Sequence, residues 1–138
     1  MNMERYAGIR AMVERLYQLT GTGQWDAVAA MLTDDFAIRE ADSLPYAGTY
    51  SGKGALQELY TKVFAYWEDP SLETGDICVG EDHAIVLVKV TATSRHSGER
   101  LEMPLAEVFH VRGDQFSGIT PYYFDTASIA RATGLLPA

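Results

Sequence analysis

The hydrophobic pattern of the chain changes its period once, near residue 70. Before that point, apolar side chains recur every three to four positions, the spacing of a helix that buries one face. This spacing predicts three helices, at residues 4–20, 23–32 and 53–67. Glycine follows the first helix, a Thr-Asp-Asp cluster follows the second and Glu-Asp-Pro follows the third, as is typical of helix ends.

After residue 70 apolar and polar side chains alternate, which is the pattern of half-buried strands. Short turn-forming segments separate these strands and predict antiparallel neighbours. A long run of strands after several helices indicates an α+β domain, with the helices on one side of an antiparallel sheet. If the sheet is curved, the space between it and the helices is the candidate site. The predicted strands cover 36–40, a short piece at 48–50, and 72–79, 84–95, 101–112 and 115–124, and Asp125 caps a final helix.

Two glutamates stand at positions where the strand pattern calls for apolar side chains. In the segment LEMPLAEVFHV, Glu107 shares one face with apolar residues on both sides of it. In FAIRE, Glu40 shares a face with Phe36 and Ile38. A carboxyl on an apolar face is a candidate for acid/base chemistry, because burial makes it harder to ionise. The apolar neighbours of Glu107 on its face are Leu101, Met103, Leu105, Phe109 and Val111.

Composition and charge narrow the range of partners. At 138 residues and 47% hydrophobic content, residues 1–138 are expected to form one domain. The formal charge is −8, and Lys and Arg do not cluster, which argues against nucleic acid and anionic membranes as partners. The lone cysteine, Cys78, cannot form an internal disulfide. With no signal-like segment and no apolar run of about 20 residues, we expect a soluble, cytoplasmic protein.

Several motifs along the whole chain resemble one family. The segments GTGQWDAVAAMLTDDFAIRE and YAGTYSGKGALQELY, followed by a hairpin sheet ending in FSGITPYYFD, are similar to the nuclear-transport-factor-2-like (NTF2-like) superfamily. The closest resemblance is to its SnoaL-like polyketide-cyclase and ketosteroid-isomerase branch. This resemblance implies a cone in which a curved antiparallel sheet wraps around a long helix, with N-terminal helices, and encloses an apolar cavity.

The resemblance also implies catalytic roles. In the isomerase branch a carboxylate base lies five positions after the Asp-Asp pair, which gives Glu40, and a protonated carboxyl on the next-to-last long strand gives Glu107. Glu40, near the cavity mouth, is expected to stay ionised more readily than Glu107. The branch's phenol on the first helix falls on Leu16, with Tyr17 about 100° around the helix. The family comparison turns Thr120 and Tyr122 inward, so Tyr122 and Tyr17 are rival candidates for the missing phenol.

These residues predict a cofactor-free isomerase or cyclase that acts on a small hydrophobic carbonyl compound. A ligand-binding or dimerisation domain without chemistry is the alternative, because the same fold hosts many functions. By analogy a homodimer is expected, with the outer sheet face as its interface. The residues expected to contact substrate are Leu16, Tyr46, Tyr60, Phe64, Trp67, Met103, Leu105, Phe109 and Thr120.

Other chemistries have weaker sequence support. The histidines His83, His96 and His110 lack the spacing of metal ligands, so no metal site is expected. Dehydratases of this fold use cavity histidines, and His110 lies on the strand face opposite Glu107. Epoxide hydrolases of the fold use an Asp-Arg-Asp set, whereas the strand pattern turns Arg39 and Arg112 away from the cavity face. No serine or cysteine has a recognisable triad partner.

Overall fold

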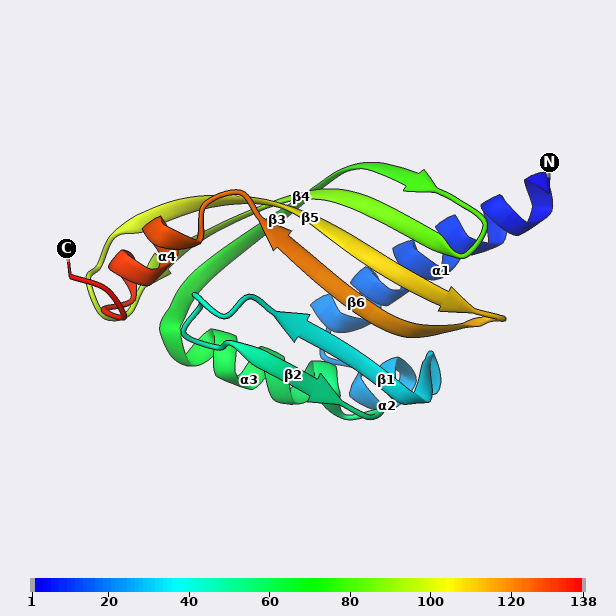
Figure 1. The fold of residues 1–138 in the computed structure, drawn as a ribbon, viewed down its shortest axis with the longest axis horizontal. Coiled ribbons are helices and arrows are strands. Elements are labelled where there is room, and N and C mark those ends of the chain that lie inside the picture. The colour runs from blue at the N-terminus through cyan, green and yellow to red at the C-terminus, as the bar shows by residue number, and fades with distance from the viewer. Residues whose placement is uncertain (1, 138) are drawn as a thin grey trace.

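The computed structural model describes residues 2–137 and contains four helices and one six-stranded sheet (Figure 1). The three helices and four long strands predicted from the hydrophobic period are all present. In chain order the elements are α1 (Met3–Gly21), α2 (Trp25–Ala30), β1 (Leu32–Glu40), β2 (Gly48–Ser51), α3 (Ala55–Tyr66), β3 (Trp67–Val79), β4 (His83–Ser94), β5 (Arg100–Arg112), β6 (Gln115–Tyr123) and α4 (Thr126–Ala132).

The strands are arranged in the order β2-β1-β6-β5-β4-β3. The predicted hairpins β3–β4, β4–β5 and β5–β6 are all antiparallel. One pair in this otherwise antiparallel sheet is different, because β1 and β6 run parallel. No short turn joins these two strands, so chain connectivity does not impose an antiparallel direction on them.

The turns between the long strands place glycine where the backbone requires it. Gly98 and Gly113 have φ values of 74° and 66° in the β4–β5 and β5–β6 connections. Residues with a Cβ avoid this left-handed region, whereas glycine enters it at little cost. These turns fix the register of β5, the strand that carries Glu107.

The third helix ends without a loop. The backbone passes from α3 at Tyr66 directly into β3 at Trp67, whereas the sequence predicted a strand only from Leu72. Pro70 lies within this strand at a register shift between Glu68 and Ser71, where a residue without an N–H is tolerated. The early start of β3 makes Trp67 part of the sheet, with 2% of its surface exposed.

The core lies between the concave face of the sheet and the helices. In Figure 1 the long strands arch over α1 and α3, while α4 lies beside the turn that joins β4 to β5. Alternate residues of β5, among them Met103, Leu105 and Phe109, are buried, as the period-two pattern predicted. Ile9 and Val13 of α1 are fully buried on the opposite side of the core. The Asp125 side chain caps α4 by accepting hydrogen bonds from the backbone N–H groups of residues 127 and 128.

Candidate active site

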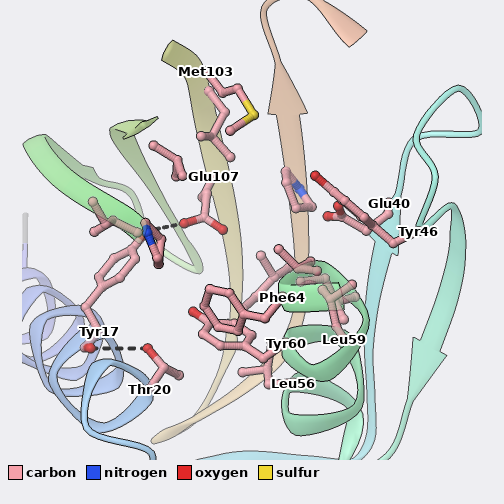
Figure 2. Close-up of a pocket in the computed structure, with 18 of the residues that line it drawn as sticks. Tyr17, Thr20, Glu40, Tyr46, Leu56, Leu59, Tyr60, Phe64, Met103 and Glu107 are labelled. Atoms are coloured by element: carbon pink, nitrogen blue, oxygen red, sulfur yellow. Dashed lines mark hydrogen bonds between the residues drawn. The ribbon is translucent and has the colours of Figure 1, made fainter. Parts of the chain in front are cut away.

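The concave face of the sheet and the helices α1 and α3 enclose a cavity of about 380 Å³ (Figure 2). Its volume is in the range of small-molecule sites. Aliphatic and aromatic side chains make up most of its wall. The polar exceptions include two carboxyls, those of Glu40 and Glu107.

Glu107 projects into this cavity from the middle of β5 (Figure 2). Its Oε1 accepts a hydrogen bond of 2.6 Å from the hydroxyl of Tyr17. This is a short hydrogen bond between two oxygens. Burial raises the pKa of Glu107, and the Tyr17 hydrogen bond opposes that rise by favouring the ionised form.

Tyr17 reaches the cavity from α1, one position after Leu16, and both residues line the wall. Its ring packs edge-on against Phe109, with centroids 5.8 Å apart. Burial, followed by the charge of Glu107, raises the pKa of Tyr17, so the phenol stays protonated and can keep donating to the carboxyl. The structure thus places the phenol at Tyr17, one residue away from the position that the family comparison marked.

Glu40 ends β1 and is almost fully buried, with 1% of its surface exposed. Its Oε2 is buried and, within residues 2–137, has no hydrogen-bond partner. Burial first, and then the nearby charge of Glu107, raise the pKa of Glu40 to about 8. The sequence placed Glu40 near an open cavity mouth, whereas the structure covers the end of the strand, and this burial is what disfavours the ionised form.

The sheet register explains why the two carboxyls influence each other. Glu107 pairs with Pro121 across the β5–β6 ladder. Ile38 pairs with Ile119 in the parallel β1–β6 ladder, so Glu40, two residues further, is level with Pro121. Glu40 and Glu107 therefore flank the same residue of β6, with backbones about 10 Å apart at twice the usual strand spacing. Because two carboxylates in one apolar cavity repel each other, ionisation of Glu107 disfavours ionisation of Glu40.

Aromatic side chains surround Glu40. The hydroxyl of Tyr46 lies near the hydroxyl of Tyr123 and the indole of Trp67. Burial raises the pKa of Tyr46 to about 12. The pKa of Tyr123 is also raised, first by burial and then by the nearby Tyr46. These phenols remain neutral donors at ordinary pH.

The predicted orientation of β6 was wrong. Tyr122 is 60% exposed, and neither Tyr122 nor Thr120 lines the cavity, whereas Ile119, Pro121 and Tyr123 do. The cause is a register shift in the β5–β6 ladder, where His110 pairs with Gly118 and Val111 with Phe116. Such a bulge changes which alternate residues point inward. Before the bulge the even-numbered Phe116 is buried, and after it the odd-numbered Ile119 is buried.

The other predicted contact residues line the cavity, and the sequence missed two important ones. Pro121 and Tyr123 went unrecognised because the parity assigned to β6 was reversed. The apolar Ile119 was the available signal, since it shares parity with both. The predicted residues that do line the cavity are Leu16, Tyr46, Tyr60, Phe64, Trp67, Met103, Leu105 and Phe109.

The residues considered for other chemistries lie elsewhere. His110 packs against His83, with ring centroids 4.8 Å apart, and is not part of the cavity wall. Arg112 pairs with Asp35, and Arg39 with Asp42, through exposed side chains. Across residues 2–137, no group of three or more His, Cys, Asp or Glu side chains is arranged to hold a metal ion. In that same part of the chain, no helix has both the length and the apolar character of a membrane span.

Comparison with known families assigns the chain to one of them. Residues 13–119 match the SnoaL-like domain family, and the chain belongs to it. No curated protein is similar enough in sequence to match.

Solved structures share the fold. An NTF2-like protein from Burkholderia xenovorans LB400 is 23% identical, with a TM-score of 0.82 over 96% of this chain and 98% of that one. A protein from Jannaschia sp. CCS1, provisionally named a SnoaL-like polyketide cyclase, is 14% identical, with a TM-score of 0.83 over 99% of both chains. Another, from Xanthomonas campestris pv. campestris and provisionally named a polyketide cyclase, is 19% identical, with a TM-score of 0.71 over 93% of this chain and 98% of that one. The NTF2-like cone predicted from the sequence is thereby confirmed.

Proposed function

We propose that this protein is an acid/base enzyme, an isomerase or cyclase, that acts without a cofactor on a small hydrophobic carbonyl compound in the cavity. The observation that carries the proposal is the arrangement of Glu107, Tyr17 and Glu40 around one apolar space. Two carboxyls with different surroundings can divide the roles of base and acid between them.

Glu107 is the better candidate for the base. Its carboxyl faces the cavity, and Tyr17 stabilises the ionised form. Glu40 is the better candidate for the acid, because its pKa is raised to about 8 and its neutral form persists at pH 7. This assignment reverses the roles that the resemblance implied, and it rests on the different hydrogen bonding of the two side chains.

In the proposed reaction, Glu107 removes a proton from a carbon next to the carbonyl. The electrons of that C–H bond form a carbon–carbon double bond, and the carbonyl oxygen becomes an enolate oxygen. Neutral Glu40 donates a hydrogen bond to this oxygen. In an isomerase the substrate carries a further carbon–carbon double bond conjugated with the enolate, and Glu107 returns the proton to the far carbon of that double bond. In a cyclase, the enolate carbon instead attacks a second carbonyl of the same molecule, and the new alkoxide takes up the proton that Glu107 had removed.

Tyr17 acts in this scheme as a positioning residue. Its single O–H is committed to Glu107, so it orients the base and lowers the pKa of that carboxyl. The provisional names of the Jannaschia and Xanthomonas proteins favour cyclisation of a polyketide-like compound. Their identities of 14% and 19% support the fold more strongly than the substrate.

The test is proton exchange measured by NMR in D₂O with cyclic enones, β-keto esters and steroid ketones. We expect exchange at carbons adjacent to the carbonyl, and a loss of about 100-fold or more in Glu107→Gln. Glu102→Gln is the matched control, because Glu102 lies on the same strand and pairs with Lys89 through an exposed side chain. Exchange that is equally fast in Glu107→Gln would refute the role of Glu107.

The alternative is a binding domain with the same cavity and no chemistry. It predicts that carbonyl compounds bind to the wild type without any exchange of their protons. It also predicts that both glutamate-to-glutamine variants bind these neutral ligands with little change in affinity. Binding assays run on the same panel therefore separate the two functions.

A further inference from the structure

The charges around the cavity are unbalanced. In residues 2–137 its wall includes two carboxyls, whereas no Lys, Arg or His side chain lines it. Buried carboxylates are normally paired with a cation or neutralised by a proton, because an unpaired charge is costly to bury. Here the protein itself supplies no cation for the pair.

Glu40 adds a second, independent observation. Its side chain is buried to 99%, as only 1% of its surface is exposed, and its Oε2 has no hydrogen-bond partner within the described part of the chain. A buried oxygen without a partner loses its hydrogen bonds to water and gains none in return. A ligand in the cavity that carries a positive charge or an N–H group would satisfy it.

The aromatic wall suits a cation as well. Tyr60 and Phe64 of α3 lie across the cavity from Glu107 (Figure 2), with ring planes at 78° and centroids 5.9 Å apart. Tyr17 contributes a third ring, nearly perpendicular to that of Phe109. Aromatic rings that enclose a space from different directions attract organic cations through their negatively polarised faces. The overall charge of −8 also favours the approach of a cation.

We propose that the cavity binds a small hydrophobic ammonium ion, a protonated or quaternary amine whose positive charge lies between Glu40 and Glu107. The apolar part of such a ligand occupies the aliphatic wall, and its charge replaces the missing basic side chain. The proposal concerns the charge of the ligand and does not depend on turnover. A substrate that fits both this and the proposed function is a carbonyl compound carrying a basic nitrogen.

Binding of a cation must be linked to the protonation of the pair. The titratable groups that face the two carboxyls are phenols: Tyr17 from α1, Tyr46 from the loop after β1, Tyr60 from α3 and Tyr123 from β6. All four have raised pKa values and stay neutral below pH 9. Any change in affinity between pH 6 and pH 9 for a ligand of fixed charge therefore reports on Glu40 and Glu107.

The experiment compares benzyltrimethylammonium, whose charge is independent of pH, with its neutral carbon isostere neopentylbenzene. Binding is followed by the fluorescence of the tryptophans, of which Trp67 lines the cavity. We expect the cation to bind about tenfold or more tightly than the isostere at pH 9. Its affinity should fall as the pH is lowered to 6, because protonation of the carboxyls competes with the cation. The affinity of the neutral compound should stay constant.

Glu40→Gln should weaken cation binding and flatten its pH dependence while sparing the neutral isostere, and Glu102→Gln should change neither. The wild-type comparison needs no variant, so the test stands even if Glu40→Gln folds poorly. Equal affinity for the cation and the isostere across the pH range would overturn the proposal. Because binding is measured directly, the result is independent of whether proton exchange is found with carbonyl compounds.

Discussion

The hydroxyl of Tyr17 and the carboxyl of Glu107 are 90 positions apart in the chain, and their oxygens lie 2.6 Å apart across the cavity. One comes from the first helix and the other from the fifth strand. The bond joins the helical layer to the sheet. It also gives Glu107 a donor that Glu40 lacks, and this difference sets the two carboxyls apart.

Removing the Tyr17 hydroxyl should raise the pKa of Glu107. The hydrogen bond stabilises the ionised carboxyl, so Tyr17→Phe is expected to shift the titration of Glu107 upward. The measurement is a ¹³C NMR titration of the glutamate side-chain carboxyls. Tyr60→Phe is the control, because Tyr60 lines the same cavity without a hydrogen bond to Glu107. An unchanged titration in Tyr17→Phe would contradict the proposed role of the phenol.

The buried Glu40 should make the protein less stable as the pH rises. Its pKa is 4.5 in an unfolded chain and about 8 in the folded protein, so between these values the folded state binds more protons. The stabilising contribution of the neutral carboxyl is therefore fully present below about pH 4.5 and is lost as the pH rises to 8. The loss is on the order of a few kcal/mol.

Urea denaturation at pH 5, 6.5 and 8 measures this effect. The free energy of unfolding of Glu40→Gln should fall less steeply over this range than that of the wild type, because the glutamine stays neutral. Glu102→Gln should follow the wild type, since the Glu102 side chain is exposed on the surface of the sheet and lies outside the cavity. Parallel pH profiles for wild type and Glu40→Gln would show that Glu40 titrates normally.

Substitution of the two neighbouring tyrosines on β6 should affect the rate of proton exchange differently. Tyr123 lines the cavity beside Tyr46 and Glu40, whereas Tyr122 is 60% exposed on the other face. We expect Tyr123→Phe to slow proton exchange several-fold, because it removes a neutral donor near the proposed acid. Tyr122→Phe should leave the rate unchanged. The opposite result would mean that the inward face of β6 has been assigned incorrectly.

The outer face of the sheet is expected to form a homodimer. Side chains on this face form two adjacent rows across the strands. In one row Ile85 of β4 pairs with Val108 of β5. In the other, Ala106 of β5 lies between Leu87 of β4 and Tyr122 of β6. Ile85 is 40% and Leu87 52% exposed, so this face is apolar and open. An exposed apolar patch of this kind is typical of an interface between protein chains.

Light scattering tests the dimer. We expect a dimer mass for the wild type and a shift toward monomer in Leu87→Lys, because a charge on this face opposes burial. Glu4→Lys is the control, because it introduces a lysine at an exposed position of α1, away from this face, and it should keep the wild-type mass. A monomer mass for the wild type at every concentration would exclude this interface.

The sequence by itself determined the kinds of elements and the inward face of most of them. Helical and strand periods depend on neighbours a few positions away, so the burial of Leu16, Phe36 and Phe109 could be predicted from local pattern alone. The same argument placed Glu107 on the cavity face of β5, because no bulge interrupts the ladder between Met103 and Phe109.

Only the tertiary structure decided the chemistry of the site. The bulge opposite Val111 reversed the face of β6, and the parallel pairing of β1 brought Glu40 level with Glu107. The bond from Tyr17 and the raised pKa of Glu40 depend on which groups surround each side chain in space. Local period carries no information on contacts between distant segments, because these are set by how the whole sheet curves and packs.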